Sequence, residues 1–95
     1  MLVDSHCHLN HDGLTQNIPD VIKRANEAGV SHMVCICTRL LEFEAVSQIA
    51  DNYDNVYCSV GIPPHDADKE PVPEVETLVA LAKHRKTVGI GETGL

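Results

Sequence analysis

Two histidines near the amino terminus, His6 and His8, have a spacing that suits metal coordination. Residues 1–8 are typical of a short buried strand that ends on these two side chains. Because side chains alternate along a strand, we expect Asp4, His6 and His8 to share one face and Cys7 to point the other way. Two imidazoles at the end of a strand direct their nitrogens to one point, which is the arrangement that a divalent metal needs.

A second stretch that could take part in chemistry is Gly89–Leu95, in which the carboxylate of Glu92 lies among glycines. Glycine lets the backbone bend and come close to a ligand. A single glutamate after a strand is more often a solvated loop charge, so Glu92 alone indicates little. Together, His6, His8 and Glu92 form a donor set of two imidazoles and one carboxylate, which suits Zn, Mn or similar ions.

Four other residues have both a functional and an ordinary interpretation. The Asp4 carboxylate is either an acceptor for a histidine ring N–H or a cap for the following turn. Arg39 binds a phosphate or is a surface arginine ahead of a helix. His65 and Asp66 contact substrate or form only a turn with an Asx hydrogen bond, and the sequence favours the contact with substrate for both.

The remaining histidines and the cysteines are expected to be structural. His11, His32 and His84 fall in loops or at a helix end, where we expect them to be solvated. Buried free thiols are favoured over a disulfide framework, because three of the four cysteines lie in apolar, strand-like runs. The cluster Lys83–Lys86 follows a helical run and there stabilises the negative end of a helix dipole, or it binds phosphate.

Length and charge restrict the possible functions. The chain has 95 residues and a formal net charge of −7, so it is one domain at most and lacks the basic surface that binds nucleic acid unaided. If the chain meets nucleic acid, metal ions must supply much of the positive charge. The sequence has no run of about 18 apolar residues and no signal-peptide pattern, so we expect a cytoplasmic protein without membrane association.

Hydrophobic periodicity predicts four strands and three helices in alternation. The run 32–38 is nearly all apolar, as expected for a strand buried on both faces. The other strands are expected at 1–8, 56–61 and 87–90, and the helices at 17–29, at 41–53 and around 75–82, with Val75, Leu78, Val79 and Ala82 along one side of the last. This βαβαβαβ order predicts an α/β fold with a parallel sheet, whose strands bring their carboxyl ends to one edge.

Three motifs, taken in order, resemble a known family. They are Met1–Leu9 (MLVDSHCHL), Ser59–Gly61 with Pro64–Ala67, and Gly89–Leu95 (GIGETGL). They are similar to the amino-terminal portion of the TatD family of metal-dependent deoxyribonucleases, and the resemblance runs over all 95 residues. It implies a TIM-type (β/α)8 barrel of about 250 residues. Residues 1–95 would be the amino-terminal portion of that single barrel, with strands one to four and helices one to three.

The resemblance also implies roles for individual residues. His6 and His8 correspond to the family's first metal pair, and Glu92 to the catalytic carboxylate that bridges two divalent ions, which are Mg, Mn or Zn. The implied reaction is two-metal hydrolysis of phosphodiester bonds in DNA. The sequence departs from the family at Pro63, where a histidine is frequent, and at Asn10, where an aspartate is common. Later family ligands are not in this sequence, so we expect the 95 residues alone to be inactive or nearly so.

Two other functions remain open at this point. The chain is a non-catalytic fragment that binds metal or self-associates, or it is part of a related barrel hydrolase that acts on an amide or ester. Half a barrel has open sheet edges rich in Val, Ile and Cys, and such edges pair with other strands. Metal titration and sedimentation distinguish these possibilities.

Overall fold

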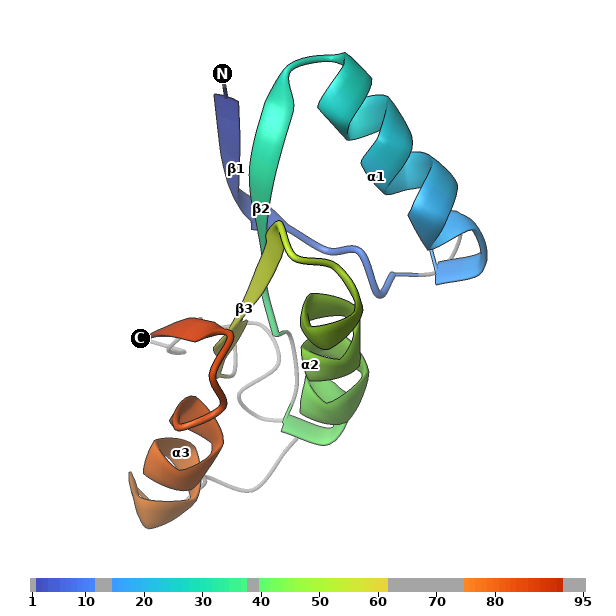
Figure 1. Ribbon diagram of the computed structural model, residues 1–95. Helices are drawn as coiled ribbons and strands as arrows, with labels where there is room; N and C mark the ends of the chain where they lie inside the picture. Colours follow the sequence, from blue (N-terminus) through green and yellow to red (C-terminus); the bar gives the residue numbers. More distant parts are fainter. Residues whose placement is uncertain (1, 12–14, 38–39, 62–74, 92–95) are drawn as a thin grey trace.

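Four strands and three α-helices alternate along the chain, in a computed structural model that describes residues 2–11, 15–37, 40–61 and 75–91 (Figure 1). The sheet is wholly parallel with the order β1-β2-β3-β4, which confirms the predicted topology. None of the described helices is long and apolar enough to cross a membrane. The elements are β1 (Leu2–Cys7), α1 (Ile18–Glu27), β2 (Val30–Cys35), α2 (Phe43–Asn52), β3 (Val56–Val60), α3 (Val75–Ala82) and β4 (Thr87–Ile90), with short 3-10 turns η1 (Thr15–Asn17) before α1 and η2 (Leu40–Glu42) before α2.

The end of α1 sets the position of β1. Pro19 lies in the first turn of this helix, where its missing N–H costs nothing. Gly29 follows the helix with φ +95°, a conformation that side-chain-bearing residues rarely adopt and that ends helices. The carbonyl of Gly29 then accepts a 2.8 Å hydrogen bond from the Leu2 N–H, so the predicted glycine cap also places the first strand.

One face of the central strands packs against the helices. α1 lies beside β2 and α2 beside β3 (Figure 1). Alternate side chains of β2 and β3 enter the core, as the period of two along a strand requires. The core residues are Met33 and Cys35 from β2, Val56, Cys58 and Val60 from β3, Ile22 from α1, Phe43, Val46, Ile49 and Ala50 from α2, and Leu9 and Cys37 from the connections.

Two predictions about strand burial were wrong. β2 was expected to be buried on both faces, but His32 is exposed and Val34 is only half-buried, because the helices cover just one side of the strand. β1 was expected to be buried, but Leu2 and Val3 are 62% and 60% exposed. The described sheet gives β1 a single neighbour, β2, so its side chains gain little cover.

Three cysteines form a row across neighbouring strands. Cys7 is the register partner of Cys35, and Cys35 is the partner of Cys58. The row ends at β4, where the Cys58 thiol lies 3.5 Å from the Thr87 hydroxyl. All four cysteines of the chain are free, as predicted; three of them are buried and Cys7 is half-buried.

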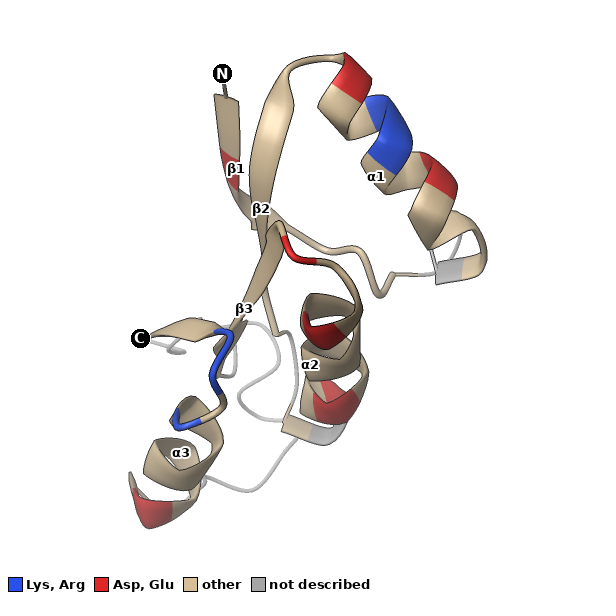
Figure 2. Ribbon diagram, viewed as in Figure 1, with Lys and Arg blue, Asp and Glu red and all other residues tan. Residues whose placement is uncertain are grey.

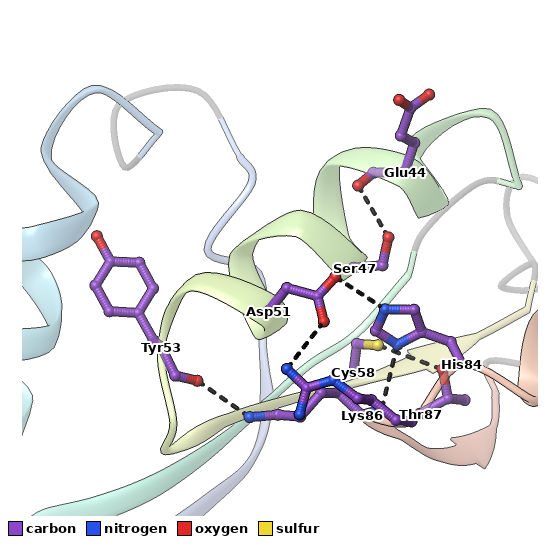
Figure 3. A network of polar contacts seen from close by, with 9 residues as sticks. Glu44, Ser47, Asp51, Tyr53, Cys58, His84, Lys86 and Thr87 are labelled. Atoms are coloured by element: carbon purple, nitrogen blue, oxygen red, sulfur yellow. Dashed lines mark hydrogen bonds and ion pairs between the residues drawn. The ribbon is translucent and has the colours of Figure 1, made fainter.

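Lys86, at the amino end of β4, is 7% exposed. Its ammonium group donates 3.1 Å hydrogen bonds to the carbonyls of Tyr53 and Asp54, and it lies 4.5 Å from the centre of the Tyr57 ring. Figure 3 shows Lys86 reaching the end of α2. Lys86 therefore places its cation at the carboxyl end of α2, whereas the sequence associated the cluster Lys83–Lys86 with the preceding helix, α3.

His84 was predicted to be solvated, but its side chain is half-buried and makes specific contacts. Its Nε2 lies 3.1 Å from an Asp51 carboxylate oxygen, and its Nδ1 accepts a 3.2 Å hydrogen bond from the backbone N–H of Lys86 (Figure 3). The ring also meets the Phe43 ring edge to face, with centroids 6.1 Å apart. His84 thus connects α2 to the start of β4. Although it follows α3 in the sequence, its side chain contacts the earlier helix α2.

The predicted apolar side of α3 is only partly buried. Leu78 and Ala82 pack against the core as expected, and Leu81 joins them. Val75 and Val79 are instead 71% and 45% exposed. This difference arises because the described part of the fold gives α3 only β3 and β4 as close neighbours.

Candidate metal site at the carboxyl end of the sheet

His6 and His8 come together at the carboxyl end of β1. Their ring centroids are 5.1 Å apart and the ring planes meet at 80°. The pairing register shifts at this point: Asp4 to Cys7 spans three steps of β1, whereas their partners Met33 and Cys35 span two steps of β2. The extra residue is a bulge, a feature that re-aims side chains.

Asp4 stabilises the backbone of this bulge. Its carboxylate accepts a 3.1 Å hydrogen bond from the backbone N–H of His6. The contact favours the capping interpretation of Asp4 over that of an acceptor for a histidine ring. Asp4 therefore acts on the position of the His6 main chain.

Cys7, between the two histidines, faces the core as predicted. Its thiol donates to the carbonyl of Val34 at 3.4 Å and packs against the buried cluster. Burial, with smaller contributions from Cys35 and Asp4, raises the pKa of the Cys7 thiol to about 12. The thiol is therefore protonated at neutral pH in the metal-free chain, and its direction into the core turns it away from the face that carries His6 and His8.

The turn after β1 holds the ring of His8. Leu9 is buried and anchors the turn in the core, and the backbone N–H of His11 donates to the carbonyl of His8 at 3.2 Å. The His8 and His11 rings are stacked, with centroids 4.5 Å apart and planes 9° from parallel. His11 is exposed, as predicted for a solvated residue, but its ring contact with His8 was not predicted.

Asn10 links this turn to the neighbouring elements. Its amide donates to the Glu42 carboxylate at 3.5 Å, and its side-chain oxygen accepts from the Cys35 thiol at 3.9 Å. The family-typical aspartate would put a second negative charge beside Glu42. The asparagine at this position therefore suits the local electrostatics.

Ser59 joins the carboxyl ends of three strands, and sequence reasoning missed it. Its hydroxyl donates to the carbonyl of Gly91 at 2.9 Å and accepts from the backbone N–H of Cys37 at 3.3 Å. The Gly91 N–H in turn donates to the Val60 carbonyl at 2.9 Å. These bonds fix the backbone immediately before Glu92. A buried hydroxyl inside the apolar run 56–60 was the available signal.

The glycine-dependent bend near Glu92 and the close approach of a ligand there stay predictions, since Glu92 and Gly94 lie outside the described residues. A Cβ added at Gly89 or Gly91 would meet no atom within 4 Å, and neither residue has a positive φ. Gly89 and Gly91 therefore both have open space beside their main chain.

Four predicted site residues, Glu92, Arg39, His65 and Asp66, lie outside the described residues, as does Pro63. Their proximity to His6 and His8 stays a prediction. Within residues 2–11, 15–37, 40–61 and 75–91, no group of three or more His, Cys, Asp or Glu side chains is placed to hold a metal. The structure thus brings together two imidazole donors of the predicted three-ligand set, and their chemistry fits a divalent ion such as Zn or Mn.

Comparison with known proteins identifies the family. The family model described as "TatD related DNase" matches residues 3–95. The chain belongs to this family. Human "Deoxyribonuclease TATDN3" is 28% identical over 103 residues, and "Uncharacterized metal-dependent hydrolase YabD" of Bacillus subtilis is 30% identical over 95 residues. These matches cover 99% and 100% of the chain.

The TatD-family fold is confirmed by a solved structure. The chain superimposes on the crystal structure of YjjV, a TatD homologue from Escherichia coli, with a TM-score of 0.82, 24% identity and 96% of the chain covered. The four strands and three helices are therefore the first part of a TIM-type barrel, as predicted. The chain spans a little over a third of the relatives it matches: 38% of TATDN3, 37% of YabD and 36% of the YjjV chain.

Proposed function

We propose that this chain forms part of a metal-dependent hydrolase, and that the hydrolase is a deoxyribonuclease with a two-metal site. The observation that carries the proposal is the edge contact of His6 and His8 at the carboxyl end of β1, the edge where TIM-type barrels bind and react with substrates. The names of the relatives support it, since TATDN3 is called a deoxyribonuclease and YabD a metal-dependent hydrolase. Residues 1–95 are proposed to be the amino-terminal portion of one barrel.

Each predicted site residue has a proposed role. His6 and His8 would hold the first of two divalent ions, which are Mg, Mn or Zn, and Glu92 would supply the carboxylate that the family resemblance assigns to both ions. The ions supply an activated water and charge stabilisation at the phosphate. The chain's own residues do the positioning: the turn after β1 orients the His8 ring, and Ser59 fixes the backbone that leads to Glu92.

Substrate contacts are proposed for His65, Asp66 and Arg39. His65 donates a hydrogen bond to a phosphate oxygen, and Arg39 binds phosphate through its planar guanidinium group. Asp66 orients His65 or accepts from a sugar hydroxyl. These contacts would lie at the carboxyl edge because the three residues follow β2 and β3 in the sequence.

The charge distribution supports a metal requirement for DNA binding. Among the described residues, Lys and Arg occur only on α1 and in the connection from α3 to β4 (Figure 2). That connection leads to the amino end of β4, away from the carboxyl edge. With a formal charge of −7, the chain repels a polyanion unless bound cations screen the site.

Metal-dependent DNA association tests the proposal. A fluorescent single-stranded oligonucleotide is titrated with the chain, with Mn²⁺ or with EDTA, and anisotropy is measured. We expect binding only with Mn²⁺, and its loss in the double variant His6→Ala, His8→Ala. His32→Ala, which removes another exposed histidine, is the control and should bind as the wild type does. Binding that persists in EDTA or in the double variant would refute the proposal.

Little hydrolysis is expected from the 95 residues alone. The family resemblance places further ligands on later strands, so His6, His8 and Glu92 bind metal without a complete catalytic shell. A related amide or ester hydrolase remains the alternative. Metal binding without any affinity for the oligonucleotide would favour that alternative. The four free thiols suit the proposed cytoplasmic location, where thiols stay reduced.

Self-association is a second proposed property, because exposed apolar side chains lie on both outer strands. Leu2 and Val3 on β1 are more than half exposed, and so are Val88 and Ile90 on β4. Each of these strands has one neighbour in the described sheet, and unpaired strand edges recruit other strands. Sedimentation velocity over a concentration series should show dimers or larger species. A Val3→Lys, Val88→Lys variant should shift the distribution to monomer, and a monomeric wild type would contradict the proposal.

A further inference from the structure

We propose that His11 is a positioning residue for the metal ligand His8. This inference rests on the proposed metal site. Nothing in the motifs of the sequence marks His11, which follows the His6–His8 pair by three residues and was expected to be solvated. Its assignment comes from the geometry of one ring pair.

The stacked arrangement is specific. The His8 and His11 rings are 9° from parallel with centroids 4.5 Å apart, at the short end of the range for stacked aromatic pairs. The His6 ring meets His8 from another direction, at 80°. His8 is therefore held between an edge contact on the side of its fellow ligand and a face contact from His11.

The backbone makes this stacking possible without depending on the His11 side chain. The turn is closed by the 3.2 Å hydrogen bond from the His11 N–H to the His8 carbonyl, and Leu9 anchors it in the core. A substitution at His11 keeps both of these interactions. The His11 ring is also exposed, so its removal opens no cavity. Its effect should thus be confined to the orientation of His8.

Orientation of a ligating ring affects metal affinity. An imidazole binds a metal along the lone pair of one nitrogen, and rotation about the two side-chain torsions of histidine moves that lone pair away from the ion. A flat neighbour parallel to the ring removes part of this freedom before the metal arrives.

Metal titration of the 95-residue chain tests the inference. Isothermal titration with Co²⁺ gives the dissociation constant, and the visible absorption spectrum of bound Co²⁺ reports the ligand geometry. We expect His11→Ala to weaken Co²⁺ binding by about three- to tenfold and to alter the spectrum. His11→Phe keeps a flat ring without a ligating nitrogen, and it should bind within about twofold of wild type. His32→Ala, at an exposed histidine on β2, should change neither readout.

The outcomes separate this inference from the proposed site. Loss of binding in His8→Ala with wild-type affinity in His11→Ala would overturn the positioning role and keep the site. An affinity in His11→Phe as low as in His11→Ala would also overturn it, since His11 would then act through its nitrogen. Wild-type affinity in both His6→Ala and His8→Ala would show that the proposed metal site itself is wrong.

Discussion

In the described sheet, the central strands β2 and β3 contribute more to the buried core than the outer strands β1 and β4 do. On β3, Val56, Cys58 and Val60 have no exposed surface, and the neighbouring β2 buries Met33 and Cys35 in the same core. On β1, five of six residues are exposed, and β4 has no fully buried residue. The candidate ligands nevertheless belong to the outer strands, since His6 and His8 end β1 and Glu92 follows β4.

This difference concerns stability first. A buried aliphatic side chain stabilises the fold through the apolar area it removes from water, and in the described residues that area is concentrated at β2 and β3. The proposed ligands His6 and His8 lie outside that buried area, at the carboxyl end of β1, and Glu92 follows β4 in the sequence. Substitutions in the centre should therefore change the free energy of unfolding, whereas those at the edge should change binding.

The pH dependence of stability is the broadest test of the buried centre. Burial raises the pKa of Cys35 and Cys58 above the ordinary value of 9.0. Above about pH 9 the unfolded chain loses these protons while the folded chain keeps them, so stability is full below pH 9 and falls as pH rises. Urea unfolding should show a free energy of unfolding that falls progressively above about pH 9, until the pH passes the raised pKa values of the folded-state thiols. Cys58→Ala should have a shallower slope, and an unchanged slope would contradict burial as the cause.

A matched pair of valines compares the centre with the edge directly. Val56→Ala removes a fully buried side chain from β3 and should lower the free energy of unfolding by about 2 kcal/mol. Val88→Ala removes a side chain that is 60% exposed on β4 and should cost less than about 0.5 kcal/mol. Urea unfolding measures both. Equal losses would mean that β4 is covered in solution.

Lys86 provides a test at the amino end of β4. Lys86→Met keeps the aliphatic stem but removes the hydrogen bonds to the Tyr53 and Asp54 carbonyls. We expect a loss of about 1–2 kcal/mol in thermal or urea unfolding. Lys83→Ala, at an exposed lysine in the same connection, should be near neutral. A neutral Lys86→Met would show that water replaces the ammonium group at no cost.

Ser59 should show a modest effect on stability and a local effect on the backbone near the site. Ser59→Ala removes the hydroxyl that joins Cys37 to Gly91, and we expect a loss of about 1 kcal/mol. Amide hydrogen exchange should accelerate at Cys37, because its N–H loses the Ser59 hydroxyl as acceptor, and remain unchanged at Met33. Uniform acceleration at both amides would indicate global destabilisation in place of a local role.

The order of elements was predictable because it depends on local pattern. Pro19 and Gly29 mark the ends of α1, and the apolar run 56–60 gives β3 almost to the residue. The free state of the cysteines and the inward direction of Cys7 also followed from alternation along a strand. The approach of His6 to His8 was expected from the same alternation, although the register shift beside them leaves no signature in the residue types.

The wrong predictions concern contacts between distant parts of the chain. His84 meets Asp51 across 33 residues, and Lys86 reaches the end of α2 across a similar separation. Burial of β1 was overestimated because burial depends on which neighbour covers a strand and not on the strand's own composition. The role of Ser59 was overlooked because a serine inside an apolar run is interpreted simply as part of a strand. Its hydrogen-bond partners, Cys37 and Gly91, are distant in the sequence and come close only in the folded sheet.

The bonds from Lys86 to the end of α2 have a consequence for engineering this scaffold. They lie at the amino ends of β3 and β4, whereas the histidines occupy the carboxyl end of β1. A library that varies Tyr53, Asp54 and Lys86 for thermostability would thus leave the ligand geometry untouched, and a library around His6 and His8 would leave this anchor intact. The two ends of the strands can be optimised in separate rounds and then combined, with their effects on unfolding expected to add.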